Sequence, residues 1–484
     1  MVPTLFGLIS IVIGLALLVR GTSLDLLRFM MFSTLFSGSA AIIMTALGGS
    51  SISPAHLAMV FLVARILLPG SGEYARIGPA LSANAFLAVY AVYGAASAFI
   101  LPRIFEGQMY VSPLRPITVK SLFDTVPLVF TNQNVTTAVY MLGTLLSGIC
   151  ATIVAHRPDS SRKIVRAACI IAWAHATFGV LGVVLTNLGH GELLNLFRNG
   201  SYGQLEQSYN GMVRISGIFP EASYYASYAF IWFVFVFECW MRDVQPRRTG
   251  PAAIALLLIL IFSTSGSAYL SLGVYGALLV LRLLVLRQQL SPFKMVAILV
   301  GLVAALLAAM GTVLLVPHLA DQLADMFQHM TMDKADSVSG RQRSFWAMQG
   351  LEAFVASYGL GIGAGSFRSS SLFTAMLGSM GVVGVVAFLG HLVRVFKPMR
   401  ASTYGSPKDE RMAAGSAASW TVLCMMIPAA IGAASPDPGV NFAIMGGLAL
   451  EWRRRRSEVP AARQVRPAPY RPPTRPQVRS RSLY

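Results

Sequence analysis

The stretch GIFPEASYYASYAFIWFVFVFECWMRDVQPRR, from Gly217 to Arg248, decides the class of fold. Polar residues lead into an apolar run over 223–241, and a basic segment follows that run. About 20 apolar residues are enough for an α-helix to cross the roughly 30 Å hydrocarbon core of a bilayer. The stretch therefore predicts a membrane-spanning helix with a polar entrance and a basic exit.

Similar apolar runs recur along most of the 484-residue chain, of which 55% is hydrophobic and 12% is charged. This composition excludes an ordinary soluble domain, and the runs lack the alternation typical of β-barrel strands. The sequence predicts an all-α integral membrane protein with about 12–13 transmembrane helices in residues 1–452. The expected spans are 2–19, 27–46, 54–69, 80–101, 134–154, 164–186, 223–241, 251–263, 267–286, 294–316, 371–391, 416–433 and 440–452.

Five basic segments fall on one face of this arrangement, which the positive-inside rule assigns to the cytoplasm. They are His156 to Lys163, Met241 to Arg248, Arg287 to Lys294, His391 to Arg411 and Arg453 to Arg456. The long connections 102–133, 187–222 and 317–370 then lie together on the opposite side. Because they share one compartment, they could build one site.

The C-terminal tail, residues 453–484, holds ten arginines and one acid, and so supplies half of the formal net charge of +18. It is rich in proline and lacks apolar periodicity, which predicts a disordered cytoplasmic segment. Basic charge in a chain of this class indicates orientation and contact with anionic membrane lipids. No nucleic-acid partner is therefore expected.

Motifs for metal or nucleotide binding are missing from the sequence: there is no HExxH, CxxC pair or P-loop. Neither a metal nor a cofactor is predicted. His190 lies in the second long connection and is a candidate glycan contact, although a scattered histidine is more often a surface residue.

Polar groups crowd the point where the chain enters the 223–241 span. Arg214, Glu221, Tyr224 and Tyr225 lie within twelve residues. A charge near hydrocarbon is costly unless it is paired or hydrated, so this cluster is a candidate site. The alternative is an interfacial anchor, in which aromatic rings lie at headgroup depth and Glu221 caps a helix.

The third long connection contains a second candidate cluster. Phe345, Met348, Leu351 and Val355 recur at roughly helical spacing, which predicts an amphipathic helix in the membrane interface. The stretch GLGIGAGS, 359–366, permits tight turns and close backbone approach. Arg341 and Arg343 precede it and Arg368 follows. Planar guanidinium groups bind phosphate through paired hydrogen bonds, so three arginines suit a pyrophosphate. Alternatively, the first two flank the helix and Arg368 snorkels.

Three motifs together resemble the bacterial O-antigen polymerase and O-antigen ligase superfamily. They are GIFPEASYYASY (217–228), STSGSAYLSLG (263–273) and GLGIGAGSFRSSSLFTAMLGSMGVVG (359–384), and the resemblance covers roughly residues 130–400. It implies a membrane-glycosyltransferase-like (GT-C-like) fold in the bacterial inner membrane, with an active site on the periplasmic face. The implied substrate is a glycan linked to undecaprenyl pyrophosphate, and a chain-length-regulating co-polymerase is an implied partner.

Ligases of this superfamily share a Thr-x-Ser-Arg hairpin and a histidine after the late glycine turn. Here Thr264, Ser265 and Gly266 are followed by no arginine, and the glycine turn leads to Phe367, Arg368 and Ser369. These departures favour a polymerase of a surface or secreted polysaccharide. Ligase-like transfer to a lipid acceptor, or transport of a lipid-linked glycan, remains the alternative.

The resemblance implies an inverting, metal-independent glycosyl transfer. A sugar hydroxyl of one repeat unit would attack the anomeric carbon of a chain held on undecaprenyl pyrophosphate. Catalytic roles are expected for Glu221, as base or acceptor-orienting group, and for Arg214 and Arg341. Arg343 and Arg368 are expected to bind the pyrophosphate. Tyr224, Tyr225 and His190 are expected to contact the glycan.

Overall fold

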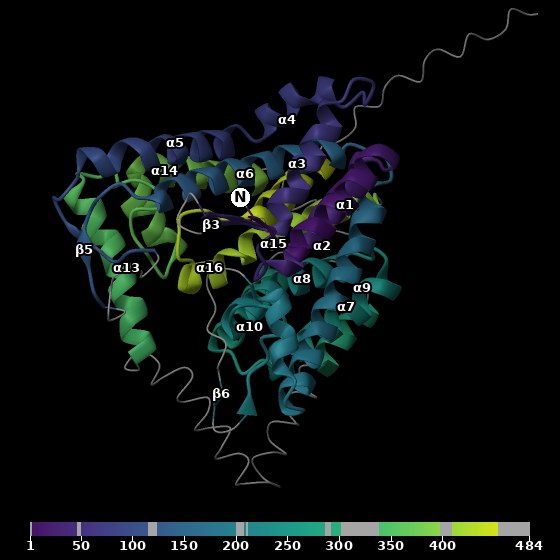
Figure 1. Ribbon diagram of the computed structural model, residues 1–484. Coiled ribbons are helices and arrows are strands. Elements are labelled where there is room, and N and C mark those ends of the chain that lie inside the picture. Colours follow the sequence, from purple (N-terminus) through teal and green to yellow (C-terminus); the bar gives the residue numbers. More distant parts are fainter. Residues whose placement is uncertain are drawn as a thin grey trace, which may run out of the picture. The chain divides into compact units, whose positions relative to one another are not determined.

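The computed structural model describes residues 2–45, 50–114, 123–199, 208–209, 212–285, 292–301, 338–396 and 409–453, which are predominantly α-helical (Figure 1). The helices are α1 Leu5–Arg20, α2 Ser23–Ser33, α3 Pro54–Leu67, α4 Ile77–Ala83, α5 Ala85–Ile104, α6 Asn132–Ala155, α7 Ser160–Asn187, α8 Ala222–Met241, α9 Pro246–Phe262, α10 Gly266–Val285, α13 Val338–Ala356, α14 Leu372–Phe396, α15 Glu410–Cys424, α16 Met426–Gly432 and α17 Val440–Trp452. A short apolar helix covers Pro292–Gly301.

Short 3₁₀ helices and small antiparallel sheets complete the described part of the chain. The 3₁₀ helices are η1 Thr34–Phe36, η3 Tyr74–Arg76 and η4 Gly191–Phe197. The strands are β1 Val2–Pro3, β2 Ile42–Met44, β3 Ser50–Ile52, β4 Tyr110–Val111, β5 Val126–Pro127, β6 Ser208–Tyr209 and β7 Met212–Val213, paired in the orders β1-β2-β3, β4-β5 and β6-β7. Each strand has only two or three residues, so the sheets join loop segments and form no layer of the fold.

Seven helical segments among the described residues are long and apolar enough to cross a membrane. They are α5, α6, α7, α8, α10, α14 and the consecutive pair α15 and α16. Helices α1, α3 and α17 are apolar but shorter. The prediction of an all-α, multi-pass membrane protein is confirmed.

The predicted span 27–46 is wrong. Helix α2 ends at Ser33, and the chain continues through η1 into strand β2. Two residues between η1 and β2 form hydrogen bonds to the connection that precedes α8. Ser39 Oγ donates to the Phe197 carbonyl at 2.6 Å, and the backbone N–H of Ala40 donates to Asn199 Oδ1 at 2.8 Å. Hydrogen bonds to a loop thus replace those of a continuing helix.

The predicted span 416–433 begins earlier and is interrupted. It starts at Glu410, ends as α15 at Cys424, and resumes as the short helix α16. Residues 433–439 then lead back to α17, which matches the predicted span 440–452. Of span 294–316, only the part up to 301 lies within the described residues. Residues 317–337 of the third long connection and the tail beyond 453 lie outside them.

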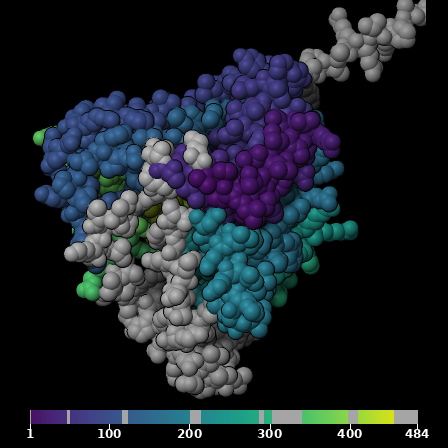
Figure 2. All heavy atoms as spheres, viewed as in Figure 1, coloured from purple at the N-terminus to yellow at the C-terminus, as the bar shows by residue number. Residues whose placement is uncertain are grey.

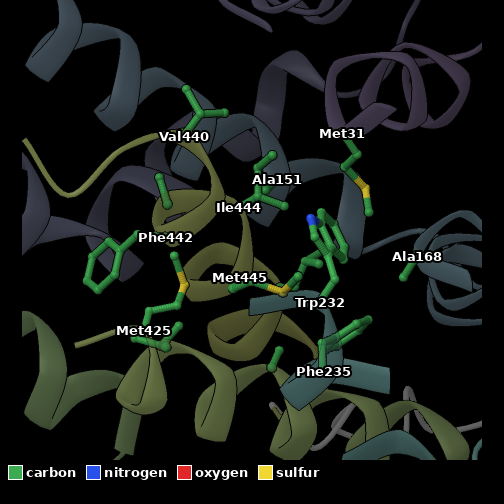
Figure 3. Packing of buried hydrophobic residues seen from close by; sticks show 14 of the residues in the cluster. Met31, Ala151, Ala168, Trp232, Phe235, Met425, Val440, Phe442, Ile444 and Met445 are labelled. Atoms are coloured by element: carbon green, nitrogen blue, oxygen red, sulfur yellow. The ribbon is translucent and has the colours of Figure 1, made fainter. Parts of the chain in front are cut away.

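Helix α17 is the centre of the packing. Nearly all of its residues are buried, and it packs against α6 and α15. Figure 3 shows its residues Ile444 and Met445 close to Trp232 of α8 in the buried cluster. A Cβ at Gly447 would lie 2.5 Å from the Gly148 carbonyl oxygen of α6, so only glycine permits this close crossing.

Helix α1 presents apolar side chains outward. Leu8, Val12, Leu15 and Val19 are each about half exposed or more. In Figure 2 this helix, in purple, lies on the surface of the face shown. An apolar outer surface is expected of a helix that contacts lipid, whose tails are as apolar as leucine.

Buried charges meet where α8 ends. Glu238 is fully buried and accepts hydrogen bonds from Arg282 of α10 at 2.8 Å and from the Tyr275 hydroxyl at 2.7 Å. Arg242 pairs with its second carboxylate oxygen. The Arg282 guanidinium also lies 4.4 Å from the ring centre of Trp420. The network thus joins α8 to α10 and α15.

Candidate functional site

A cavity of about 420 Å³ lies between the beginning of α8, the beginning of α13, the glycine turn before α14, and the segment from α16 to α17. Its polar lining is Glu221, Ser223, Tyr224, Ser227, Ser267, Gln342, Arg343, Arg368, Ser369, Ser370, Ser435 and Asp437. Its apolar lining includes Ile231, Trp346, Met425, Met426 and Pro428. The volume lies in the range typical of small-molecule sites.

Glu221 stands at the start of α8. It occupies the N-cap position with extended backbone angles, and its carbonyl accepts the Tyr225 N–H at 3.0 Å. Its carboxylate makes no capping bond to the helix; instead Oε1 accepts the Ser223 hydroxyl at 2.5 Å. Glu221 is also one of the residues that line the cavity.

Arg214 belongs to the same electrostatic cluster. Burial lowers the pKa of Arg214 from its usual value, the Glu221 carboxylate acts to raise it, and Arg343 acts to lower it. Arg214 itself is absent from the cavity lining. Its charge nevertheless interacts with the carboxylate of Glu221, which does line the cavity.

Arg343 and Arg368 both line the cavity, as the sequence suggested. Arg343 Nη1 lies 3.4 Å from the Ile431 carbonyl oxygen, and its own carbonyl accepts the Ser370 hydroxyl at 2.6 Å. The Arg368 guanidinium stacks 4.2 Å from the ring centre of Trp346. Cation–π stacking of this kind fixes the plane of the guanidinium.

The glycine turn holds Arg368 in place. Gly361, Gly363 and Gly365 all have positive φ, and a Cβ at any of them would come within 2.7 Å of neighbouring atoms. Phe367, which is 2% exposed, inserts into a small apolar cluster with residues of α5 and α13. Close backbone approach was expected from this motif, and the geometry requires it.

The second and third long connections line the cavity, and the first is bonded to the third. The Arg368 N–H donates to the Ser112 carbonyl at 2.9 Å, and the Ser112 N–H donates to Gln349 Oε1 of α13 at 2.6 Å. The first connection therefore supports the part of the cavity lining that contains Arg368. The second connection contributes Glu221, and the third contributes Arg343 and Arg368. Figure 1 shows α13 beside α14, with which it packs.

Arg341 differs from its neighbour Arg343. It is exposed and does not line the cavity, so its expected catalytic role loses its geometric basis. Two positions along a helix correspond to a rotation of about 200°. The two arginines of one motif therefore face opposite directions.

The two tyrosine candidates, Tyr224 and Tyr225, also differ in whether they line the cavity. Tyr224 lines the cavity and keeps 43% of its surface accessible. Tyr225 is fully buried: its ring stacks on His175 at 4.0 Å, and its hydroxyl donates to the His175 carbonyl. Tyr225 therefore cannot contact a glycan in this cavity. His190 is exposed just before η4 and does not line the cavity.

The segment Ala433 to Gly439 was missed by the sequence reasoning, and it lines one side of the cavity. It contains Asp437, whose Oδ1 accepts the Thr144 hydroxyl at 2.8 Å and the Gly439 N–H at 3.2 Å. An acid between two prolines, Pro436 and Pro438, in a break between apolar helices was the available signal.

The cavity lining extends along α8. Tyr224, Ser227 and Ile231 line it at helical spacing, and Ile231 lies ten residues beyond Glu221, or about 15 Å along the helix. The charged Glu221 thus lies at one end of this row and the apolar Ile231 at the other. Among the described residues, no three His, Cys, Asp or Glu side chains gather as metal ligands.

No family model, curated protein or solved structure matched the chain.

Proposed function

We propose that the chain is an inner-membrane glycosyltransferase that polymerises undecaprenyl-pyrophosphate-linked repeat units into a surface polysaccharide on the periplasmic face. The observation that carries the proposal is the mixed lining of the cavity. Glu221, Arg343 and Arg368 line it, and so do Ile231, Met425 and Met426. A substrate with a charged head and an apolar tail matches this lining.

The two arginines supply the electrostatic part of the proposal. In glycosyl transfer from a lipid pyrophosphate, negative charge builds on the leaving group in the transition state. Guanidinium groups already fixed by Trp346 and by the Ile431 carbonyl need little reorganisation to stabilise that charge. Arg214, whose charge interacts with those of Glu221 and Arg343, adds a third positive charge to the same region.

The carboxylates supply the acid–base part. The acceptor hydroxyl must lose its proton as it attacks, and Glu221 and Asp437 both line the cavity. Tyr224, beside Glu221, offers an aromatic face to a sugar ring. A co-polymerase that regulates chain length is the proposed partner, and the tail beyond 453 is proposed to lie in the cytoplasm.

The first prediction compares two arginines two positions apart in α13. In Arg343→Ala the transition state loses a fixed donor, and polymerisation should fall about 100-fold or more. Arg341→Ala removes the same charge from an exposed position and should stay within about twofold of wild type. The measurement uses purified protein with lipid-linked repeat units and a gel ladder of the glycan products.

The wild-type result decides between functions. A ladder supports polymerisation, transfer of glycan to a lipid A core acceptor without a ladder indicates a ligase, and no transfer at all favours lipid-linked glycan transport. Equal losses in the two variants would contradict the assignment of the cavity, since only Arg343 lines it.

A further inference from the structure

We infer that Asp437 is the general base that takes the proton from the attacking sugar hydroxyl, and that Glu221 holds the arginine cluster instead. This inference rests on the proposed function and assigns one step of it to a residue that no sequence motif suggested. It is carried by the construction of the segment Ala433 to Gly439.

The segment has no helical structure, although it lies between two apolar helices. Helix α17 has 13 residues and rises only about 20 Å, whereas the hydrocarbon core is about 30 Å thick. A helix of this length leaves room at membrane depth for the segment that precedes it. Irregular backbone at membrane depth is tolerated where it lines a cavity or is buried in protein, and this segment lines the cavity.

The segment is fixed at several points. The Ala434 carbonyl accepts the Ser369 N–H at 3.1 Å, beside Arg368, and the Pro436 carbonyl accepts the Tyr90 hydroxyl of α5. The Pro436 and Pro438 rings restrict the backbone on both sides of Asp437. A catalytic group needs to be held close to its productive geometry, and this segment does so.

The Asp437 carboxylate has one oxygen anchored and one available. Among the described residues, the two donors that bind it, Thr144 Oγ1 and the Gly439 N–H, both reach Oδ1. Oδ2 is therefore left for a ligand in the cavity.

Glu221 is less suited to the same role. Its Oε1 already accepts the Ser223 hydroxyl at 2.5 Å, and it interacts with the charge of Arg214. A carboxylate committed to a neighbouring cation orients and neutralises that cation. Glu221 thus offsets the repulsion between the charges of Arg214 and Arg343.

The proposed glycosyl transfer needs no reactant besides the two lipid-linked substrates and these side chains. The acceptor oxygen forms a bond to the anomeric carbon as the bond from that carbon to the pyrophosphate oxygen breaks. The hydroxyl proton moves to Asp437 Oδ2, and the electron pair of the broken bond leaves with undecaprenyl pyrophosphate beside Arg343 and Arg368. The proton then passes to water.

The test compares Asp437→Asn with wild type in the purified polymerisation assay, with kcat and KM measured for the acceptor repeat unit. Asparagine keeps an oxygen that accepts both hydrogen bonds, so the unfolding temperature should not change. We expect kcat to fall about 100-fold or more with KM within about threefold. Glu221→Gln should lower kcat less than tenfold. The exposed Glu192→Gln on η4 is the matched control and should behave as wild type.

Each result decides. If wild type makes a ladder and Asp437→Asn keeps a kcat within about threefold, the inference is overturned while polymerisation stands; a rise in KM alone also overturns it. If wild type makes no ladder, the proposed function itself fails.

If Asp437→Asn does not fold, the variant Thr144→Val decides instead, because it removes one hydrogen bond to Asp437 but keeps the carboxylate. Activity within about tenfold of wild type supports a base, whereas a loss as large as that expected for Asp437→Asn indicates a structural role.

Discussion

Helix α8 carries a glutamate at each end, and the two lie in opposite surroundings. Glu238 is closed in by Arg242, Arg282 and Tyr275, with no exposed surface. Glu221 faces an open cavity in the company of Arg214 and Arg343. Glutamate and arginine thus form a fully buried network at one end of α8 and line a cavity at the other end. A sealed network serves packing, whereas a charged cavity is suited to a ligand.

The largest effect is expected when the sealed network is broken. Glu238→Ala leaves two arginines buried without their carboxylate and should lower the free energy of unfolding by about 3–5 kcal/mol. Thermal unfolding in detergent measures it. Glu221→Ala is the matched change at the open end and should cost about 0.5 kcal/mol or less. Similar losses for both glutamates would remove the distinction between the two ends.

A smaller effect is expected from Arg368→Lys, which keeps the positive charge at the cavity but changes the shape of the charged group. Arg368→Lys retains the positive charge, but an ammonium neither stacks in the same way on Trp346 nor offers a planar fork to phosphate. Its kcat/KM should fall about tenfold, or about 1.4 kcal/mol, with little change in unfolding temperature. Full activity in this variant would indicate that charge alone suffices at this position.

The smallest effect is expected at the support of Glu221. Ser223→Ala removes the hydroxyl that donates to Oε1 at 2.5 Å, and such a bond contributes about 0.5–1.5 kcal/mol. Activity should fall by severalfold, and Glu221→Gln should add little to it because the two act through one contact. Full additivity in the double variant would show that the serine does not act through Glu221.

The sequence located much of this site because its signals are local. Apolar runs predicted the long helices, and the polar residues before 223 marked the entrance of α8. Arg343 and Arg368 also followed from a single motif. Local spacing did not separate Tyr224 from Tyr225, because neighbours on a helix point about 100° apart and only the packing on His175 decides which ring is buried.

The features that could not be predicted from the sequence depend on contacts between residues far apart in the chain. Asp437 became part of the site through Thr144, which lies almost three hundred residues earlier. The break after α2 likewise depends on Phe197 and Asn199, which no window around residue 39 contains. The choice between Arg341 and Arg343 required the rotational setting of α13. Each of these is a property of packing between distant elements.

The central place of α17 also has a consequence for biogenesis. This helix comes last among the described helices, yet it packs against both α6 and α15, with Gly447 against the Gly148 backbone. Because chains emerge from the ribosome in order, those earlier helices must wait in the bilayer with an open slot until residue 452 has been synthesised. Truncation before 440 should therefore leave a bundle that membrane quality control recognises and degrades.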